Sequence, residues 1–127
     1  MEAYFDNSAT TRCSAAAADL MMKVLREDFG NPSALHGRGM AAEQYIRDSR
    51  KKIAATLKAK EKEIFFTSGG TEANNLALVG CAMANRRSGR HLITTSIEHP
   101  SVENPMCYLE EQGFEVTRLG VDRRGRD

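Results

Sequence analysis

Residues 64–75, which read I-F-F-T-S-G-G-T-E-A-N-N, constrain the fold of this chain most strongly. The run begins with apolar, aromatic or β-branched residues, and a helical pattern follows Gly69 and Gly70, so it predicts a strand, a tight turn and a helix. Backbone N–H groups and the positive end of the helix dipole would then face one spot, which favours an anion such as phosphate. The alternative is an ordinary connection in which Ser68 or Thr71 serves only as the helix N-cap.

The sequence of this turn does not match either of two common nucleotide-binding motifs. A Walker A loop requires G-x-x-x-x-G-K-[ST], and a dinucleotide fingerprint requires G-x-G-x-x-G. Neither pattern occurs around Gly69 and Gly70. The local pattern therefore leaves open both an anion-binding turn of another kind and an ordinary strand-to-helix connection.

The composition fits a small-molecule site better than a nucleic-acid or membrane partner. The chain has 127 residues, enough for one domain with a core, and its 18 basic and 17 acidic residues give a net charge of +1. This balance offers no electrostatic case for binding nucleic acid or an anionic membrane. No apolar run approaches the roughly 18 residues of a membrane helix, and the start does not resemble a leader segment, so we expect a soluble, cytoplasmic protein.

The cysteines and histidines do not suggest a disulfide framework or a metal site. Cys13, Cys81 and Cys107 are odd in number and have no C-x-x-C spacing, so reduced thiols are expected. Cys81 and Cys107 fall on apolar helical patterns, which predicts that both are buried. The three histidines are too scattered along the chain to suggest metal ligands.

Periodicity and stop signals predict helices that alternate with short strands. A helix capped by Ser14 is expected to run to about residue 28, and a loop over 30–39 is expected before a second helix over about 40–57. Further strands are expected at about 92–96 and 114–119. This order predicts βαβ crossovers and a parallel sheet, and so an α/β protein.

Two helices follow the glycine turn in this prediction. The first ends before Gly89, and Gly80 among its small residues suggests close packing. The second runs to about residue 112, and Pro105 is tolerable if that helix begins near Val102. The residues predicted to be buried on the first helix are Ala73, Leu76, Ala77, Gly80, Met83 and Ala84.

Four blocks of the sequence resemble the signatures of cysteine desulfurases, which are pyridoxal phosphate (PLP) enzymes of the class V aminotransferase group. The blocks are residues 4–11 (Y-F-D-N-S-A-T-T), 29–36 (F-G-N-P-S-A-L-H), 64–75, and 93–102 (I-T-T-S-I-E-H-P-S-V). They stand in the family's order across nearly the whole chain. The resemblance implies the N-terminal part of the PLP-dependent aminotransferase fold, fold type I, built from parallel-strand βαβ units.

The resemblance also implies roles for individual residues. Gly70 and Thr71 would bind the phosphate of PLP, and His99 would lie against the cofactor ring and transfer a proton. His99 follows the carboxyl end of a predicted parallel strand, where open α/β sheets bind ligands; the alternative is a loop histidine that only caps the next helix. Asn31 and His36 are weaker site candidates.

The groups that complete PLP chemistry have no match in this sequence. The family's cofactor-binding lysine, the acidic residue facing the pyridine nitrogen and the nucleophilic cysteine are expected beyond residue 127. We therefore expect the N-terminal portion of a longer enzyme, inactive alone. Residues 1–13 would form an extended segment, and 14–127 the first part of the large PLP-binding domain, with its leading helix packed toward the small domain.

The function that the resemblance implies is the PLP-dependent removal of sulfur from L-cysteine. The products would be L-alanine and an enzyme-bound persulfide for iron–sulfur cluster assembly or other sulfur transfer. The expected partners are a second copy of the protein, as a homodimer, and a sulfur acceptor or iron–sulfur scaffold protein. Alternatives are another class V enzyme such as a selenocysteine lyase, or a non-enzymatic, truncated module that binds an anion or a partner.

Overall fold

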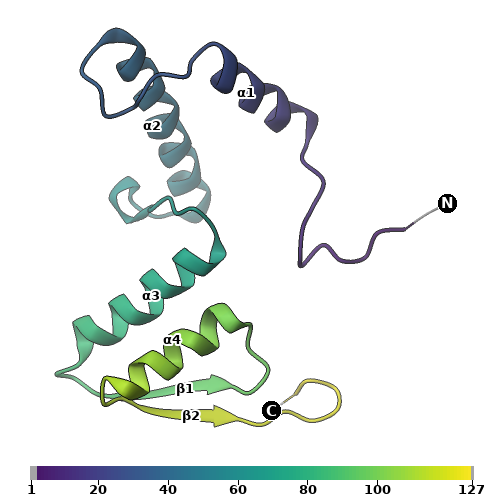
Figure 1. Ribbon diagram of the computed structural model, residues 1–127, viewed down its shortest axis with the longest axis vertical. Coiled ribbons are helices and arrows are strands. Elements are labelled where there is room, and N and C mark those ends of the chain that lie inside the picture. The colour runs from purple at the N-terminus through teal and green to yellow at the C-terminus, as the bar shows by residue number, and fades with distance from the viewer. Residues whose placement is uncertain (1–2, 127) are drawn as a thin grey trace. The chain divides into compact units, whose positions relative to one another are not determined.

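A computed structural model describes residues 3–126 of the chain, and Figure 1 shows the order of its elements. Helices and parallel strands make it an α/β protein, as the sequence predicts. The chain divides into two compact units, Met1–Phe65 and Phe66–Asp127. Each unit is described by itself. The predicted division at residue 13 stays a prediction.

The first unit begins with irregular backbone followed by helix α1 (Ala15–Arg26). The Ser14 hydroxyl accepts a hydrogen bond of 3.3 Å from the backbone N–H of Ala17, which confirms the predicted N-cap. Lys23 and Arg26 lie in the last turn, where cations complement the helix dipole.

Helix α2 (Gly37–Leu57) begins earlier than the sequence predicts, so the predicted loop over 30–39 is wrong for residues 37–39. The reason is that His36 caps the helix: its Nδ1 atom accepts a hydrogen bond of 3.2 Å from the Gly39 N–H. Gly39 is buried, and a Cβ atom there would collide with the carbonyl oxygens of Ala34 and Asn31. This glycine permits close packing of the loop on the helix start, and it does not break the helix.

A charged contact joins the end of α1 to α2. The Tyr45 hydroxyl donates a hydrogen bond of 2.6 Å to the carboxylate of Asp28, and Lys23 Nζ lies 3.5 Å from the same carboxylate. These neighbours, the Tyr45 hydroxyl foremost, hold the pKa of Asp28 below its usual value. A short 3₁₀ helix, η1 (Glu61–Glu63), follows α2.

The second unit has two helices and two parallel strands. Its elements are α3 (Gly70–Asn85), β1 (His91–Thr95), α4 (Pro100–Glu111) and β2 (Glu115–Leu119). The strands pair in register from His91 opposite Glu115 to Thr95 opposite Leu119. Helices α3 and α4 pack against each other and run in the same direction, so they begin at the same end of the unit (Figure 1).

The predicted strand at residues 64–66 is not part of this sheet, which contains only β1 and β2 among the described residues. Ile64 does adopt an extended conformation, with φ −97° and ψ 119°. The apolar run therefore sets the backbone conformation, but a strand also requires a neighbouring edge to which it can hydrogen-bond. The predicted strand at these residues is therefore not formed in this chain, although its extended conformation is.

The core of the second unit is small and centres on Leu109, which is fully buried. Ala82 and Phe114 complete the buried cluster, with Met83 and Leu92 packed against it. Most of the residues predicted to be buried on α3 are instead exposed: Ala73, Leu76, Ala77, Gly80 and Ala84. Because both sides of α3 carry small or apolar residues, periodicity does not identify which side packs. A Cβ atom at Gly80 would meet nothing within 4 Å, so this glycine is not a close-packing site.

Helix α4 begins at Pro100, so Pro105 lies beyond the first turn and not within it as predicted. Its ring is fully buried. Pro105 has no N–H to donate to the carbonyl of Ser101, one turn earlier, yet the helix continues through it. Burial of the ring offsets part of that cost.

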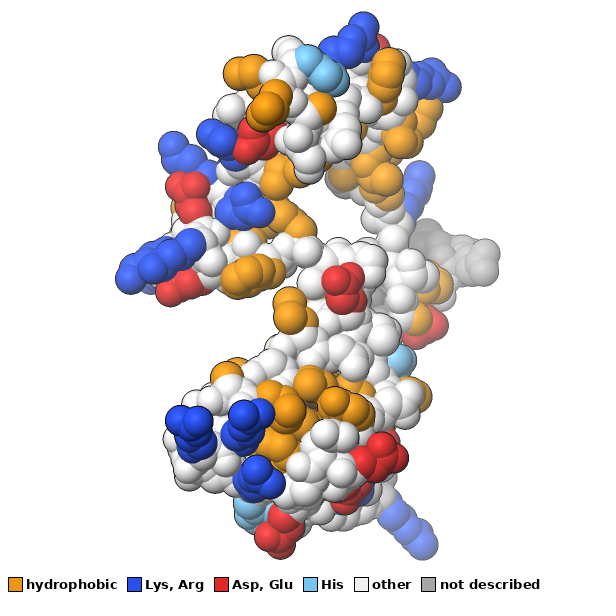
Figure 2. All heavy atoms as spheres, turned by 60° about the vertical axis from the view of Figure 1, so that its left-hand side comes forward, with side chains coloured by type: hydrophobic (Ala, Val, Ile, Leu, Met, Phe, Trp, Pro, Cys, Tyr) orange, Lys and Arg blue, Asp and Glu red, His pale blue; other side chains and the backbone are white. Residues whose placement is uncertain are grey.

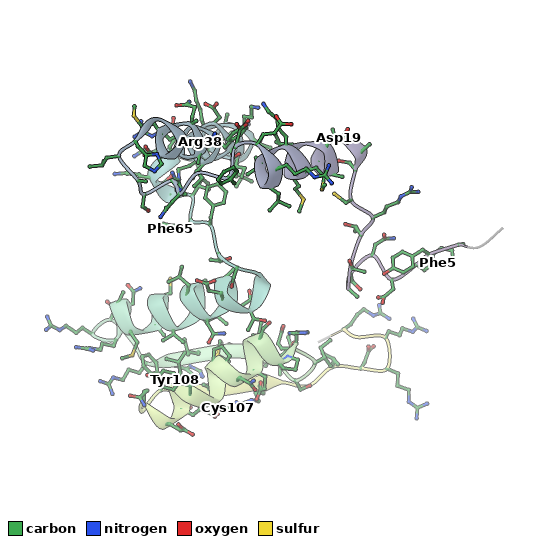
Figure 3. All side chains as sticks on the ribbon, turned by 45° about the horizontal axis from the view of Figure 1, so that its top comes forward. Phe5, Asp19, Arg38, Phe65, Cys107 and Tyr108 are labelled. Atoms are coloured by element: carbon green, nitrogen blue, oxygen red, sulfur yellow. The ribbon has the colours of Figure 1, made fainter. Side chains whose placement is uncertain are left out.

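Cys81 and Cys107 are exposed, so the prediction that both are buried is wrong. Cys107 lies on α4, where Figure 3 labels it beside Tyr108. It shares a helix face with Glu103 and Glu110, and both carboxylates bind Arg118 of β2 at 2.7–2.8 Å. This face is polar because it carries the ion-pair network, and the buried face of α4 is the opposite one.

Large hydrophobic side chains reach the surface in both units, as the orange side chains of Figure 2 show. On α1 they include Leu20, Met21 and Leu25, and on α3 Leu76. No helix of the described chain has the length and apolar content that crossing a bilayer requires.

Candidate functional site

The glycine turn leads directly into α3, as the sequence predicts. The Thr67 hydroxyl donates a hydrogen bond of 3.2 Å to the carbonyl of Gly69, and Gly69 is the N-cap residue. No side chain caps this helix end, so the alternative in which Ser68 or Thr71 is the N-cap is wrong. The N–H groups of Gly70 and Thr71 lie in the first turn, where no helical carbonyl is available to them.

Glu72 holds the turn from inside the helix, a role that the sequence reasoning missed. Its carboxylate accepts hydrogen bonds from the backbone N–H of Ser68 at 2.7 Å and from the Ser68 hydroxyl at 2.6 Å. These bonds lower the pKa of Glu72. The signal was present, since a serine shortly before an acidic residue at a helix start is typical of a capping arrangement.

The space in front of the turn is open. A Cβ atom built at Gly69 or at Gly70 would meet nothing within 4 Å. A ligand oxygen can therefore approach the backbone without displacing protein atoms. The helix dipole and the exposed N–H groups both favour an anion there.

His99 follows β1 and is the N-cap residue of α4. Its Nδ1 atom accepts a hydrogen bond of 3.0 Å from the backbone N–H of Ser101. The capping role, which the sequence reasoning raised as an alternative, is therefore present. The cap uses only Nδ1, and the exposed His99 residue keeps Nε2 available for other contacts.

One hydrogen bond joins the starts of the two helices. The side-chain amide of Asn74, in the second turn of α3, donates to the hydroxyl of Ser101 at 2.9 Å. The same hydroxyl lies 2.9 Å from Nδ1 of His99. Hydrogen bonds through Asn74 and Ser101 therefore connect α3, whose first residues are Gly70 and Thr71, with His99.

The weaker candidates, Asn31 and His36, lie in the first unit and have local structural roles. Asn31 accepts a hydrogen bond of 2.9 Å from the Ser33 N–H through its side chain, and His36 caps α2. Their predicted roles in a site stay predictions. His91 contacts the Thr117 hydroxyl at 2.8 Å, and no three His, Cys, Asp or Glu residues within 3–126 gather as metal ligands.

Comparison with known proteins decides the family. Residues 3–126 match the sequence profile of the family described as Aminotransferase class-V. The chain belongs to the class V aminotransferase family. This confirms the family predicted from the four sequence blocks, and PLP is the cofactor of that family.

This chain is similar to known proteins along almost all of its length. It is 49% identical over 122 residues to a protein named cysteine desulfurase IscS from Methanosarcina thermophila, a match covering 96% of this chain and 30% of the relative. A solved structure titled "NIFS-LIKE PROTEIN" matches with a TM-score of 0.86 and 41% identity over 98% of this chain and 34% of its own. A second, titled "SspA in complex with cysteine", matches with a TM-score of 0.81 and 42% identity over 91% of this chain and 33% of its own.

These similarities confirm the predicted α/β fold class. The chain spans about a third of the length of the relatives that it matches. The roles of Gly70, Thr71 and His99 are not tested by the comparisons and stay predictions.

Proposed function

We propose that this chain is the N-terminal third of a PLP-dependent cysteine desulfurase, which converts L-cysteine to L-alanine and keeps the sulfur as an enzyme persulfide. The observation that carries the proposal is the open start of α3, hydrogen-bonded through Asn74 and Ser101 to His99. The relative named cysteine desulfurase and the structure titled as a complex with cysteine support the reaction and the substrate.

The residues at the start of α3 suit the phosphate of PLP. The N–H groups of Gly70 and Thr71 lie in the first turn of a 16-residue helix, where an anion is stabilised by the dipole. The Thr71 hydroxyl adds a further donor. Glu72 does not compete for these donors, because its carboxylate is bound to Ser68.

His99 suits the ring of the same cofactor. An imidazole is flat, so it can stack on a pyridine ring, and it exchanges protons near neutral pH. PLP, when bound, supplies an electron sink that stabilises negative charge on the substrate carbon. In this proposal His99 lies against the ring and moves a proton at its Nε2 atom, because Nδ1 is engaged by Ser101.

The remaining partners and the cellular location extend the proposal. The enzyme would act in the cytoplasm as a homodimer and pass sulfur to an acceptor or iron–sulfur scaffold protein. None of the three cysteines is assigned as the sulfur-accepting nucleophile. The nucleophile, the cofactor-binding lysine and the acid facing the pyridine nitrogen would come from the two thirds that the relatives have and this chain does not match.

The test is to express a full-length form, in which this chain is continued to the length of its relatives, and to supply PLP and L-cysteine. We expect alanine and sulfide in equal amounts when a thiol reductant is present to release the bound sulfur. A matched reaction with selenocysteine separates a desulfurase from a selenocysteine lyase. Alanine formation no faster than with free PLP would rule out the proposal.

A further inference from the structure

The contacts of Ser101 set apart one small polar cluster in the second unit. Ser101 is one of two buried polar residues among those that the structure describes, with 8% of its surface exposed. It binds His99 through both its backbone N–H and its hydroxyl, and it binds Asn74 through the hydroxyl. A buried hydroxyl with defined partners on two helices has little freedom to rotate.

The directions of these hydrogen bonds follow from the donors available. The Ser101 backbone N–H can only donate, so Nδ1 of His99 must accept. The Asn74 amide donates to the Ser101 hydroxyl oxygen, so the hydroxyl proton is free to point at the same Nδ1 atom. Neutral His99 therefore carries its proton on Nε2.

The chain of bonds also sets the place of the His99 ring. Asn74 lies three residues after Thr71 and four after Gly70, so the three share one face of α3. The hydrogen bond from Asn74 to Ser101 thus fixes the start of α4, and with it His99, relative to the anion-binding turn. A ligand with an anionic group and a flat ring could then contact the turn with the anionic group and His99 with the ring, because the distance between the turn and His99 is fixed.

We infer that Asn74 and Ser101 are positioning residues that hold His99 as the Nε2–H tautomer, in register with the turn at Gly70 and Thr71. Neither residue needs to touch a ligand for this role. The consequence for catalysis rests on the function proposed above: with PLP bound, the fixed Nε2–H is the proton that His99 presents. Loss of the Asn74–Ser101 bond or of the Ser101 hydroxyl would remove a restraint on the His99 ring and let it rotate, because only the backbone N–H of Ser101 would still hold Nδ1.

NMR of protein labelled with ¹⁵N in histidine tests the inference without any cofactor. In the wild type we expect a through-bond coupling between the Ser101 amide nitrogen and His99 Nδ1, with the proton on Nε2. Asn74→Ala should weaken or abolish this coupling. Ser101→Ala removes the hydroxyl from Nδ1, so the Nδ1 resonance should shift toward that of an imidazole nitrogen that accepts fewer hydrogen bonds. Ser101→Thr keeps a hydroxyl and should restore the wild-type resonance.

Asn75→Ala is the matched control, because the Asn75 amide binds the Thr71 carbonyl in its own helix and not Ser101. Wild-type His99 resonances in both Asn74→Ala and Ser101→Ala would overturn the inference. If Asn74→Ala does not fold, the two Ser101 variants decide it. In the full-length form, Asn74→Ala should lower kcat for cysteine by roughly tenfold to a hundredfold with little change in KM.

The two readouts separate this inference from the proposed function. Altered His99 resonances in a protein that shows no PLP-dependent reaction would support the positioning network and overturn the desulfurase proposal. Full activity with wild-type His99 resonances in both variants would support the desulfurase proposal and overturn the positioning network. Altered resonances with unchanged kcat would overturn the catalytic consequence of positioning.

Discussion

The side chains of Asn74 and Ser101 form a 2.9 Å hydrogen bond that joins helix α3 to the first turn of α4. Ser101 is buried, so a hydroxyl that loses this partner stays out of reach of water. The bond therefore contributes to the packing of the two helices as well as to the placement of His99.

This bond gives the first prediction. Asn74→Ala should lower the free energy of unfolding by about 1–2 kcal/mol, because it leaves a buried hydroxyl without its donor. Asn75→Ala should cost less, since Asn75 is exposed and bonds only within α3. Denaturant unfolding of the two variants measures the difference. Equal losses would contradict the role assigned to Asn74.

The second prediction concerns the glycines at the start of α2. Gly39→Ala should destabilise the first unit by about 1–3 kcal/mol, because its methyl group would collide with the backbone at Ala34 and Asn31. Gly37→Ala should be neutral or stabilising, since that position has open space and alanine favours a helix. Thermal unfolding of both variants is the measurement. A stable Gly39→Ala protein would show that the loop repacks.

Several helix boundaries could be predicted because their signals are local. Ser14 caps α1 through its own side chain, and Gly113 follows α4 with φ 83°, a conformation that glycine adopts readily. His36 as a cap was missed, since histidine is not among the usual N-cap residues. The glycines beside it are typical of loops, yet Gly39 lies within the helix and allows the backbone of the preceding loop to approach it closely.

The errors share a physical cause: they depend on what the element packs against. The residues at 64–66 have strand propensity but no place in the β1–β2 sheet. The apolar positions of α3 fall on two sides, and Cys107 lies on the face where Arg118 binds Glu103 and Glu110. The glycine turn and His99 could be nominated as site residues because motif and position agree, whereas Asn74 and Ser101 come together only in space.

The third prediction is a pH dependence that arises from Glu72. Its pKa is lowered in the folded state, so the folded state favours the charged carboxylate. The stabilisation is therefore complete above the usual glutamate pKa of about 4.3, and it is lost as the pH falls through the lowered value. Glu72→Gln should unfold at a lower temperature than wild type at pH 7, with the gap closing as the pH falls through the lowered pKa of Glu72. If the difference in unfolding temperature persists at low pH, the variant is destabilised by changed packing and not by loss of the charge.

The fourth prediction tests the anion site in the full-length form. Thr71→Ala should weaken PLP retention by roughly 1.5–3 kcal/mol, because one charge-assisted hydrogen bond is lost. Gly70→Val should weaken it more, since the side chain would fill the open space through which the phosphate approaches the backbone. Equilibrium dialysis measures both. Unchanged affinity in both variants would refute the assignment of the turn.

The last prediction concerns the 127-residue chain alone. In the proposed site the turn would bind the phosphate and His99 would stack on the ring, but no lysine in this sequence resembles the family's cofactor-binding lysine in its context. The isolated chain should therefore bind PLP weakly and reversibly, without the absorption band of a lysine-linked cofactor. It should also form no alanine from cysteine above the rate of free PLP. Thr71→Ala should weaken this binding further, whereas random reaction of PLP with surface lysines should not change. Alanine formation by the chain alone would show that a lysine among these residues has been overlooked as the catalytic one.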